Sequence, residues 1–516
     1  MAKANEFHMG RTLTVLMLGA FISILNQTLL NVAIPHLMNE FNVSATTVQW
    51  LSTAYMLVNG VLVPVTAFLI ESYGTRALFI TAMALFTAGA VLCAVSNSFV
   101  LMLVGRIIQA SGAGIIMPVV MNVFLTVFPP EKRGTAMGTM GIAMMFAPAL
   151  GPTLSGWIVE HYTWRILFFM VIPLALLDIL FAYKWLTNVN KLTKPKFDFW
   201  GVVFSTLGFG VLLYGFSSAG DKGWESVTVL GSLFVGAIFI LLFILRELRM
   251  EVPMLEFRVF KYDIFTVSTI VGGLVNMAMF GAMLLLPIYL QNIRGFTPLQ
   301  SGLLLLPGAL LMGVMSPISG AIFDKIGARP LAIVGLLITA VTTFEFSKLT
   351  SDTSFSHLLM LYTVRSFGMS LIMMSVQTEG LNQLPPRLGA HGTAMSNTMR
   401  QVAGSIGTAL LVTVMSTRST LHIANSANHY TSDNPFVSED LAALGQSVAA
   451  TAGVPAETGY SLALQSVFGI VSEKGTIDGI NDAFIVATWI AIVALILSFF
   501  LRRARKPKKV KVKHAK

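Results

Sequence analysis

Several charged side chains stand inside long apolar stretches of the sequence, where an ion is expensive and usually has a task, and three of them are candidates for proton coupling. They are Arg106, Asp178 and Glu379. A carboxyl group in such a place can load and unload a proton as its surroundings change, and a nearby arginine stabilises its ionised form. These residue types therefore predict proton coupling. The alternatives are an arginine that only bonds carbonyl groups, and carboxylates that only reach the lipid headgroups or pair with a lysine such as Lys184.

The elements that must position these residues are membrane-spanning helices. Hydrophobic residues make up 55% of the 516 residues and charged residues 11%, whereas about 25% of a soluble domain is charged. This composition excludes a soluble enzyme, a disordered chain and a coiled coil. A span needs about 20 mostly apolar residues. The sequence contains fourteen such stretches, at about 12–34, 47–70, 77–96, 99–127, 135–159, 165–183, 199–218, 227–245, 264–291, 301–323, 330–348, 356–384, 393–416 and 483–501.

The positions of the basic residues predict the orientation of these spans. Most of the 34 lysines and arginines fall on the side of the N-terminus, and the tail 502–516 adds a dense group there. Because cytoplasmic segments are enriched in Lys and Arg, we expect both termini in the cytoplasm and the tail near anionic lipid. The net charge of +10 thus indicates topology, not nucleic-acid binding. Residues 417–482 are expected outside, as a loop with short helices near 438–450 and 460–472, either merely solvated or guarding the outer mouth.

Several kinds of site are not expected. Cys93 is the only cysteine, so no disulfide and no cysteine-based metal site can form. The sequence has no P-loop and no H-E-x-x-H motif, and its eight histidines form no cluster. We expect neither an enzyme nor a bound cofactor or metal, and a channel is the remaining rival to a transporter.

Two short segments of the sequence occur twice. Ala67–Arg76 is similar to Gly320–Arg329, and Gly134–Met137 recurs as Gly392–Met395, each time after two prolines. We infer two copies of a six-span unit with two spans inserted between them. Parallel halves around a midplane cavity describe an alternating-access transporter. The predicted domains are 1–190, 191–262 and 263–516.

The first repeated segment carries an acidic residue, a glycine and an arginine where a span ends. A carboxylate there meets the negative end of the helix dipole, so it needs a cation, for which Arg76 is a candidate, or the N-terminus of another helix. A latch that forms in only one state is a gate, whereas a loop salt bridge would contribute little. The predicted gate residues are Glu71, Gly74, Arg76, Asp324, Gly327 and Arg329.

At these residues the sequence resembles the major facilitator superfamily, and within it the 14-span drug:proton antiporters and the lincomycin-resistance-type bacterial efflux proteins. The matching motifs are Leu25–Pro35, Ala67–Arg76, Arg106–Gly114 and Gly141–Gly156. The resemblance implies an all-α membrane protein with two six-helix bundles plus two inserted helices, in a bacterial plasma membrane. It implies proton-driven export of lipophilic drugs without a cofactor, with Arg106 tuning a nearby carboxylate. The alternative is export of an endogenous lipid, peptide or metabolite by the same fold.

Two of these motifs raise separate questions. Many relatives have Asp where Asn26 stands, so no carboxylate is available there, and Asn26, Gln27 and Asn31 either bond a substrate or join neighbouring helices. In the fifth span, prolines remove backbone donors and bend a helix, and small residues allow close approach. This predicts either a mobile interface or tight static packing. The residues concerned are Pro148, Gly151, Pro152 and Gly156.

The substrate cavity is expected among spans 1, 2, 4 and 5 and their repeats 9, 10, 12 and 13. The 28 methionines and 36 phenylalanines suit a deformable apolar pocket, although lipid-facing or packed positions explain most of them. The expected partners are a small lipophilic substrate, protons and membrane lipids, with the chain a monomer. Besides the three polar residues of the first span, the candidate lining residues are Tyr55, Asn59, Met144, Met145, Phe146, Asn276, Gln377, Asn397 and Arg400.

Overall fold

The computed structural model describes residues 9–43, 45–189, 198–250, 253, 255–427 and 435–502. Within these ranges the chain is helical, with no strand, which confirms the all-α fold class. The longer helices are α1 (Met9–Phe41), α2 (Ala45–Tyr73), α3 (Thr75–Ala94), α4 (Phe99–Val127), α5 (Arg133–His161), α6 (Arg165–Trp185), α7 (Phe199–Lys222), α8 (Val227–Arg249), α9 (Asp263–Ile288), α10 (Pro298–Ile326), α11 (Ala328–Glu345), α12 (Phe355–Gln383), α13 (Gly389–Ala427), α14 (Pro435–Ala452) and α15 (Ala456–Ser498). Short helices cover Pro130–Lys132, Phe257–Lys261, Tyr289–Ile293, Phe346–Lys348 and Pro386–Leu388.

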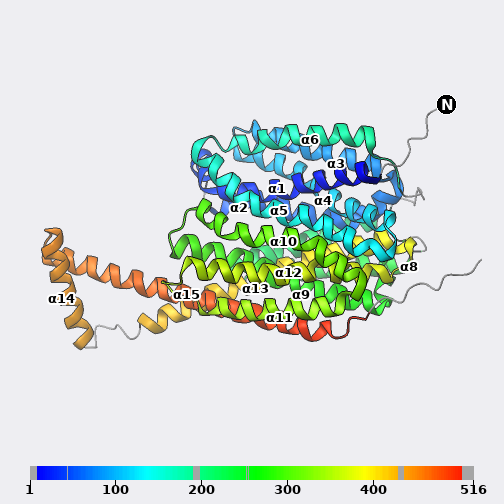
Figure 1. The fold of residues 1–516 in the computed structure, drawn as a ribbon. Coiled ribbons are helices and arrows are strands. Elements are labelled where there is room, and N and C mark those ends of the chain that lie inside the picture. The colour runs from blue at the N-terminus through cyan, green and yellow to red at the C-terminus, as the bar shows by residue number, and fades with distance from the viewer. Residues whose placement is uncertain are drawn as a thin grey trace, which may run out of the picture.

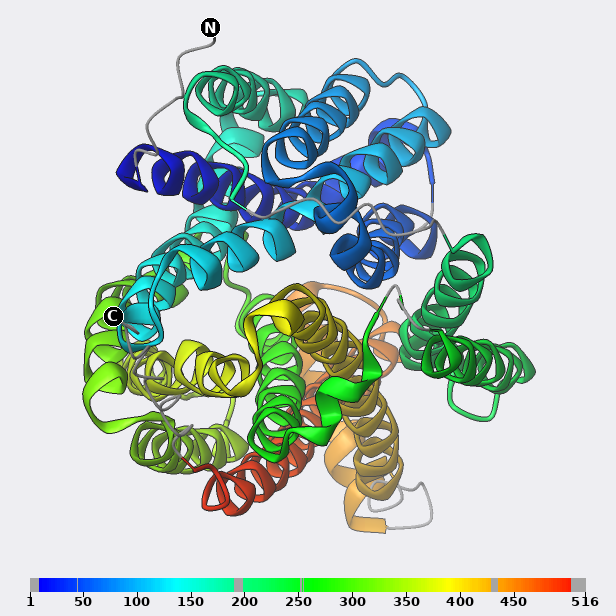
Figure 2. The same cartoon turned by 90° about the vertical axis from the view of Figure 1, so that its right-hand side faces the viewer.

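The helices form two bundles, which Figure 2 shows end-on. We call α1–α6 the N-bundle and α9–α13 with α15 the C-bundle. The two bundles use the same pairings: α1 with α5 corresponds to α9 with α13, α3 with α4 to α11 with α12, and α2 with α4 to α10 with α12. Helices α7 and α8 pair with each other beside the bundles, and α7 packs against both α2 and α13. This is the expected architecture, while the exact domain boundaries stay a prediction.

Twelve helices of the described ranges are long and apolar enough to cross a bilayer, compared with fourteen predicted spans. The two exceptions are α9, which counts only as a shorter apolar helix over Asp263–Met279, and α13. Helix α13 fails because polar residues such as Asn397, Arg400 and Gln401 interrupt its apolar ones, and it lies between the bundles against α2 and α4. The chain is a multi-pass membrane protein.

The segment 417–482, predicted as a loop with two short helices, is largely helical where it is described. Helix α13 continues to Ala427, α14 covers the first predicted helix, and the second is the beginning of α15, which runs unbroken into the last span. Figure 1 shows α14 and the start of α15 projecting beyond the bundles. Glycines allow the two helices to touch, since a Cβ on Gly445 would lie 2.8 Å from the Cα of Tyr460. A role as a guard of the mouth stays a prediction.

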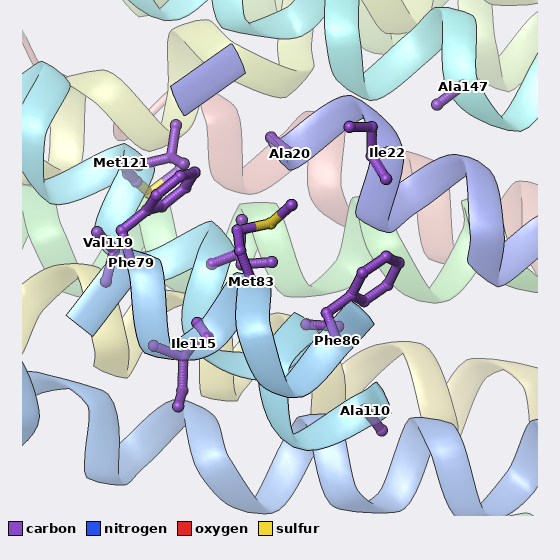
Figure 3. Close-up of a cluster of buried hydrophobic side chains, with 14 of the residues drawn as sticks. Ala20, Ile22, Phe79, Met83, Phe86, Ala110, Ile115, Val119, Met121 and Ala147 are labelled. Atoms are coloured by element: carbon purple, nitrogen blue, oxygen red, sulfur yellow. The ribbon is translucent and has the colours of Figure 1, made fainter. Parts of the chain in front are cut away.

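The core of the N-bundle is packed from large side chains of α3 against small and branched ones of α4. Phe79, Met83 and Phe86 are fully buried next to Ile115 and Val119 (Figure 3). Close contact of the two helices depends on glycine in the fourth-span motif, because a Cβ on Gly112 would collide with the carbonyl oxygen of Ala82. The motif glycines therefore hold α4 against α3.

Two identical turns mark one end of the bundles. Gly74 joins α2 to α3 with φ 77° and ψ 163°, and Gly327 joins α10 to α11 with φ 85° and ψ 179°. Only glycine adopts this backbone region readily, so both turns depend on glycine at the repeated position. We call this end, with Gly74 and Gly327, the turn end, and the opposite end, which carries α14, the hairpin end.

Candidate functional site

At the turn end, the carboxylate of Asp324 joins the C-bundle to the N-bundle. It lies in the last turn of α10 and accepts hydrogen bonds from the backbone N–H groups of Gly134 (2.8 Å) and Thr135 (2.9 Å) and from the Thr135 hydroxyl (2.6 Å). No side chain of α5 caps that helix itself, so Asp324 supplies the cap and meets the positive end of the α5 dipole. Arg133 adds a second link between the bundles by donating to the Asn382 side-chain oxygen (2.9 Å). We call this set the α10–α5 latch.

The repeated carboxylate, Glu71, makes a different contact between the bundles. Its Oε1 lies 3.2 Å from Nε2 of His391, which is in the first turn of α13. We call this pair the α2–α13 latch. The hydroxyl of Thr393, which matches Thr135 in the repeat, is buried without a hydrogen-bond partner. His391 was not predicted from the sequence, although it directly precedes the repeated segment Gly392–Met395.

Arg76, predicted as a partner of Glu71, instead closes the end of α6. Its guanidinium donates to the Tyr183 carbonyl and stacks over the Tyr183 ring at 5.2 Å, and its backbone N–H donates to the Asn188 side chain (3.0 Å). Arg329, the matching residue of the second copy, is exposed. The two carboxylates thus lie between the bundles, whereas the contacts of Arg76 stay within the N-bundle.

Between the latches and the hairpin end, α5 and α10 touch through small residues. A Cβ on Gly138 would collide with the backbone of Ser316, and one on Gly320 with the backbone of Gly134. Helix α5 is continuous through Pro148 and Pro152; the side chain of Pro152 lies outside the described parts, and the predicted bend stays a prediction. Two further glycines of the motif pack α5 on its neighbours, Gly151 against Thr28 of α1 and Gly156 against Leu299 of α10.

Arg106 lies fully buried in the N-bundle. It donates to the side-chain oxygens of Asn26 (2.9 Å) and Gln109 (2.8 Å) and to the Leu51 carbonyl (3.4 Å), and it stacks on Tyr55 at 4.1 Å. These partners are neutral, so the carboxylate that Arg106 was expected to tune is not one of them. The physical reason is local: the side chain that meets Arg106 from α1 is the amide of Asn26, which carries no charge.

A second polar cluster lies where the C-bundle faces α4. Arg400 Nη1 donates to Gln377 Oε1 (2.6 Å), while the amide of Gln377 lies 3.4 Å from Asn397 Oδ1 and 3.1 Å from the sulfur of Met121 in α4. A cavity of about 20 Å³ adjoins this cluster between α9, α12 and α13, which is room for about one water molecule. Its polar lining residues are Ser268, Thr269, Asn276, Gln377, Ser396 and Arg400.

The other candidate cavity residues lie apart from this cluster. Asn59 packs near Gly114 of α4, Phe146 lies against Gly313 of α10, and Met144 borders the N-bundle core. Gln27 is half-buried. The side chains of Asn31 and Met145 are outside the described parts of the structure.

The two candidate carboxylates have contrasting surroundings. Asp178 of α6 is 0% exposed, and neither of its carboxyl oxygens has a hydrogen-bond partner. It faces α1, where a Cβ on Gly19 would lie 2.7 Å from Asp178 Oδ2. Glu379 of α12 is also buried, but it accepts a hydrogen bond from the backbone N–H of Ala328 (3.1 Å) and so caps α11. Asp178 therefore has more freedom to take up a proton.

A carboxylate at the hairpin end, which was not predicted as a site residue, belongs to an ion pair. Glu40 accepts hydrogen bonds from Arg165 (2.7 Å) and from the Trp164 indole (3.1 Å), and Arg165 also donates to the Ser96 carbonyl (3.0 Å). The Arg165 bond, and then the Trp164 bond, hold the pKa of Glu40 below its usual value. This carboxyl stays ionised near neutral pH, so it ties α1 to α6 and is a poor proton carrier.

Comparisons with known proteins agree with this architecture. Residues 16–408 match the profile of the Major Facilitator Superfamily. The uncharacterized MFS-type transporter YhcA of Bacillus subtilis (strain 168) is 52% identical over 96% of this chain and 93% of its own. Lincomycin resistance protein LmrB of the same organism is 39% identical over 98% of both chains. The crystal structure of the human organic anion transporter MFSD10 (TETRAN) has a similar fold, with a TM-score of 0.64 at 13% identity over 95% of this chain and 99% of that one.

Proposed function

The chain belongs to the major facilitator superfamily, and from this premise we propose that it is a proton-coupled exporter of lipophilic drugs that works by alternating access. The observation that carries this proposal is the pair of latches, because Asp324 and Glu71 at repeated positions each reach the first turn of a helix in the other bundle. Contacts that join two rigid bundles at one end can break as the bundles rock. The drug class rests on likeness to LmrB, which extends over 98% of both chains.

The orientation follows from charge. The turn end carries Lys132, Arg133, Lys325, Arg329 and Arg387, and basic residues favour the cytoplasmic side. We therefore place the turn end in the cytoplasm of a bacterium, with both termini on that side of the plasma membrane. The latched structure is then closed towards the cytoplasm. One chain contains both bundles, so a monomer suffices, with a lipophilic solute, protons and lipids as partners and no cofactor.

Asp178 is the proposed proton carrier. An ionised carboxyl buried without a partner costs several kcal/mol, whereas a protonated one costs far less. In the latched state Asp178 holds a proton taken from outside. When the latches break and the bundles rock, water reaches the carboxyl from the cytoplasm and the proton leaves. Glu379 caps α11 in this scheme, and Arg106 holds Asn26, Gln109 and the α2 backbone together at the centre of the N-bundle.

The test is transport by the purified chain in liposomes with an imposed proton gradient, using a drug panel that includes lincomycin. We expect drug movement that an uncoupler abolishes. Asp178→Asn should lower gradient-driven transport by about tenfold or more, while Glu379→Gln, which keeps the acceptor that caps α11, should transport normally. Normal pumping by Asp178→Asn would refute the proton assignment. A wild-type chain that moves no drug, and gives no resistance in an efflux-deficient host, would refute drug export.

A further inference from the structure

The second polar cluster suggests the charge of the solute, an inference that rests on the proposed export function. Arg106, Arg365 and Arg400 lie in the interior of the two bundles, and the surroundings of Arg106 and Arg400 differ. The guanidinium of Arg106 donates to three oxygen atoms and stacks on the ring of Tyr55, and the side chain is fully buried. Its hydrogen-bonding capacity is largely used inside the N-bundle. A ligand could reach it only by disrupting these contacts.

The guanidinium of Arg400 makes fewer hydrogen bonds than that of Arg106. Its one described side-chain hydrogen bond goes to Gln377, and its Nε is buried with no partner. Arg400 lines the cavity between α9, α12 and α13, and none of the residues that line this cavity is acidic. Guanidinium stays protonated in proteins and carries five donors. The cluster therefore holds a half-buried positive charge whose counter-charge is not supplied by the cavity wall.

The cluster also lies where a solute could meet it. Met121 belongs to α4 of the N-bundle, yet its sulfur contacts the side-chain amides of Gln377 (3.1 Å) and Asn397 (4.0 Å) in the C-bundle. The cavity holds about one water molecule in the latched state. Movement of α4 away from α12 and α13 would withdraw Met121 and uncover the amides and the guanidinium together. Methionine is a flexible apolar cover for such a site.

We propose that Arg400 and Gln377 bind the carboxylate of a lipophilic organic acid between the opened bundles, so that acids are among the exported solutes. The guanidinium fork matches a carboxylate with two parallel hydrogen bonds. The bound anion neutralises a charge that is costly to bury alone. A protonated amine at the same place would instead bring two positive charges together. The apolar part of the acid would lie against Ile372, Met373 and Val376, which line the same cavity.

The experiment measures binding in lipid nanodiscs with three fluorescent probes of similar size: 1-pyrenebutyrate, its methyl ester and 1-pyrenebutylamine. We expect the acid to bind about tenfold more tightly than the amine, and Arg400→Gln to weaken acid binding by about tenfold or more while the ester is unaffected. Arg400→Lys, which keeps the charge without the fork, should restore part of the affinity. Arg418→Gln, at an exposed arginine of the hairpin end, is the matched control and should bind all three probes as wild type does.

Equal binding of acid and amine by the wild-type chain, or unchanged acid binding by Arg400→Gln, would overturn the inference. Repeating the measurement in phosphatidylcholine discs with and without phosphatidylglycerol identifies the anion. Unchanged acid affinity supports a free acid as the occupant, and loss of acid binding would assign the site to a lipid phosphate. Because binding needs no pumping, a chain that binds the acid but transports nothing would contradict the proposed export and leave this site standing.

Discussion

The two seams between the bundles are built from repeated sequence but differ in construction. Along the α5–α10 seam, glycines bring backbone against backbone, and the Asp324 carboxylate takes three hydrogen bonds from the start of α5. Along the α2–α13 seam the described contacts involve side chains: Glu71 lies against His391, and Gln401 packs beside Gly60. Helix α7 flanks that second seam, where Trp224 donates to Thr413 of α13 (2.8 Å).

This difference predicts that the two seams open at different stages as the bundles move. A seam of touching backbones cannot slide or part without losing many contacts at once, so we expect α5 and α10 to separate last at the turn end as the bundles rock. A seam held by side-chain contacts loses less when it opens, because side chains can turn aside. The α2–α13 seam is therefore expected to open first.

The largest effect is expected where the α5–α10 backbones touch. Gly138→Ala places a methyl group against the backbone of Ser316 and should cost up to about 3 kcal/mol through overpacking. Because the whole seam is pushed apart, we expect drug transport to fall to background at normal expression. Gly231→Ala, in α8 with open space around it, is the control and should transport as wild type does. Normal transport by Gly138→Ala would show that the seam is not tight.

Removing the carboxylate of the α10–α5 latch should have the next largest effect. Asp324→Ala loses three hydrogen bonds to an ionised acceptor, a cost of about 2 kcal/mol or more, and leaves the start of α5 uncapped. We expect roughly tenfold lower drug resistance, with a larger fraction of molecules open at the turn end. Glu71→Gln provides the comparison within the other seam and should lose less. If Glu71→Gln lost more resistance than Asp324→Ala, the proposed difference between the two seams would be wrong.

The repeated threonines give a matched pair of conservative changes. Thr135→Val removes a hydrogen bond to Asp324 and should destabilise the latched state by about 1–2 kcal/mol. Thr393→Val replaces a buried hydroxyl that has no partner, so it should be neutral or slightly stabilising. Thermal unfolding of the two purified variants measures the difference. Equal shifts in Tm would mean that the seams are equivalent at this position.

The smallest expected effect is the loss of the α2–α13 latch. His391→Leu removes the described contact with Glu71, and a single side-chain pair contributes about 0–1 kcal/mol when it is partly exposed. We expect drug resistance to fall by about threefold or less at normal expression. A loss as large as that of Asp324→Ala would mean that the two seams are equally important.

Much of the fold could be predicted because it depends on local composition and on repetition. Apolar stretches located the spans, and the repeated glycines located two turns that the structure shows in the same conformation. The segment 417–482 was harder, because its Ala, Ser and Thr content is compatible with both loop and helix. Its helices depend on contacts such as Gly445 with Tyr460, which sequence spacing does not reveal.

The site was predictable only in part. Asp324 and Glu71 were found because a carboxylate at a helix end needs a partner, but the identity of the partner depends on which helices meet. That is why His391 was missed and Arg76 was suggested in its place. Met121 looks like any other apolar residue of its helix, and its contact with Gln377 depends on the packing of two bundles. Asp178 was selected because it is a charge within a span; the structure shows it buried without a hydrogen-bond partner, and its role in proton coupling stays a prediction.

The central claim is that the bundles rock and open at the turn end, and a distance across that end tests it most directly. Spin labels at Glu131 and Arg387, both exposed, can be placed in a Cys93→Ala background because the chain has one native cysteine. The account predicts two distance populations in lipid, with the longer one enriched by Asp324→Ala and by lincomycin or another transported drug. A single distance that neither the variant nor any drug changes would contradict it.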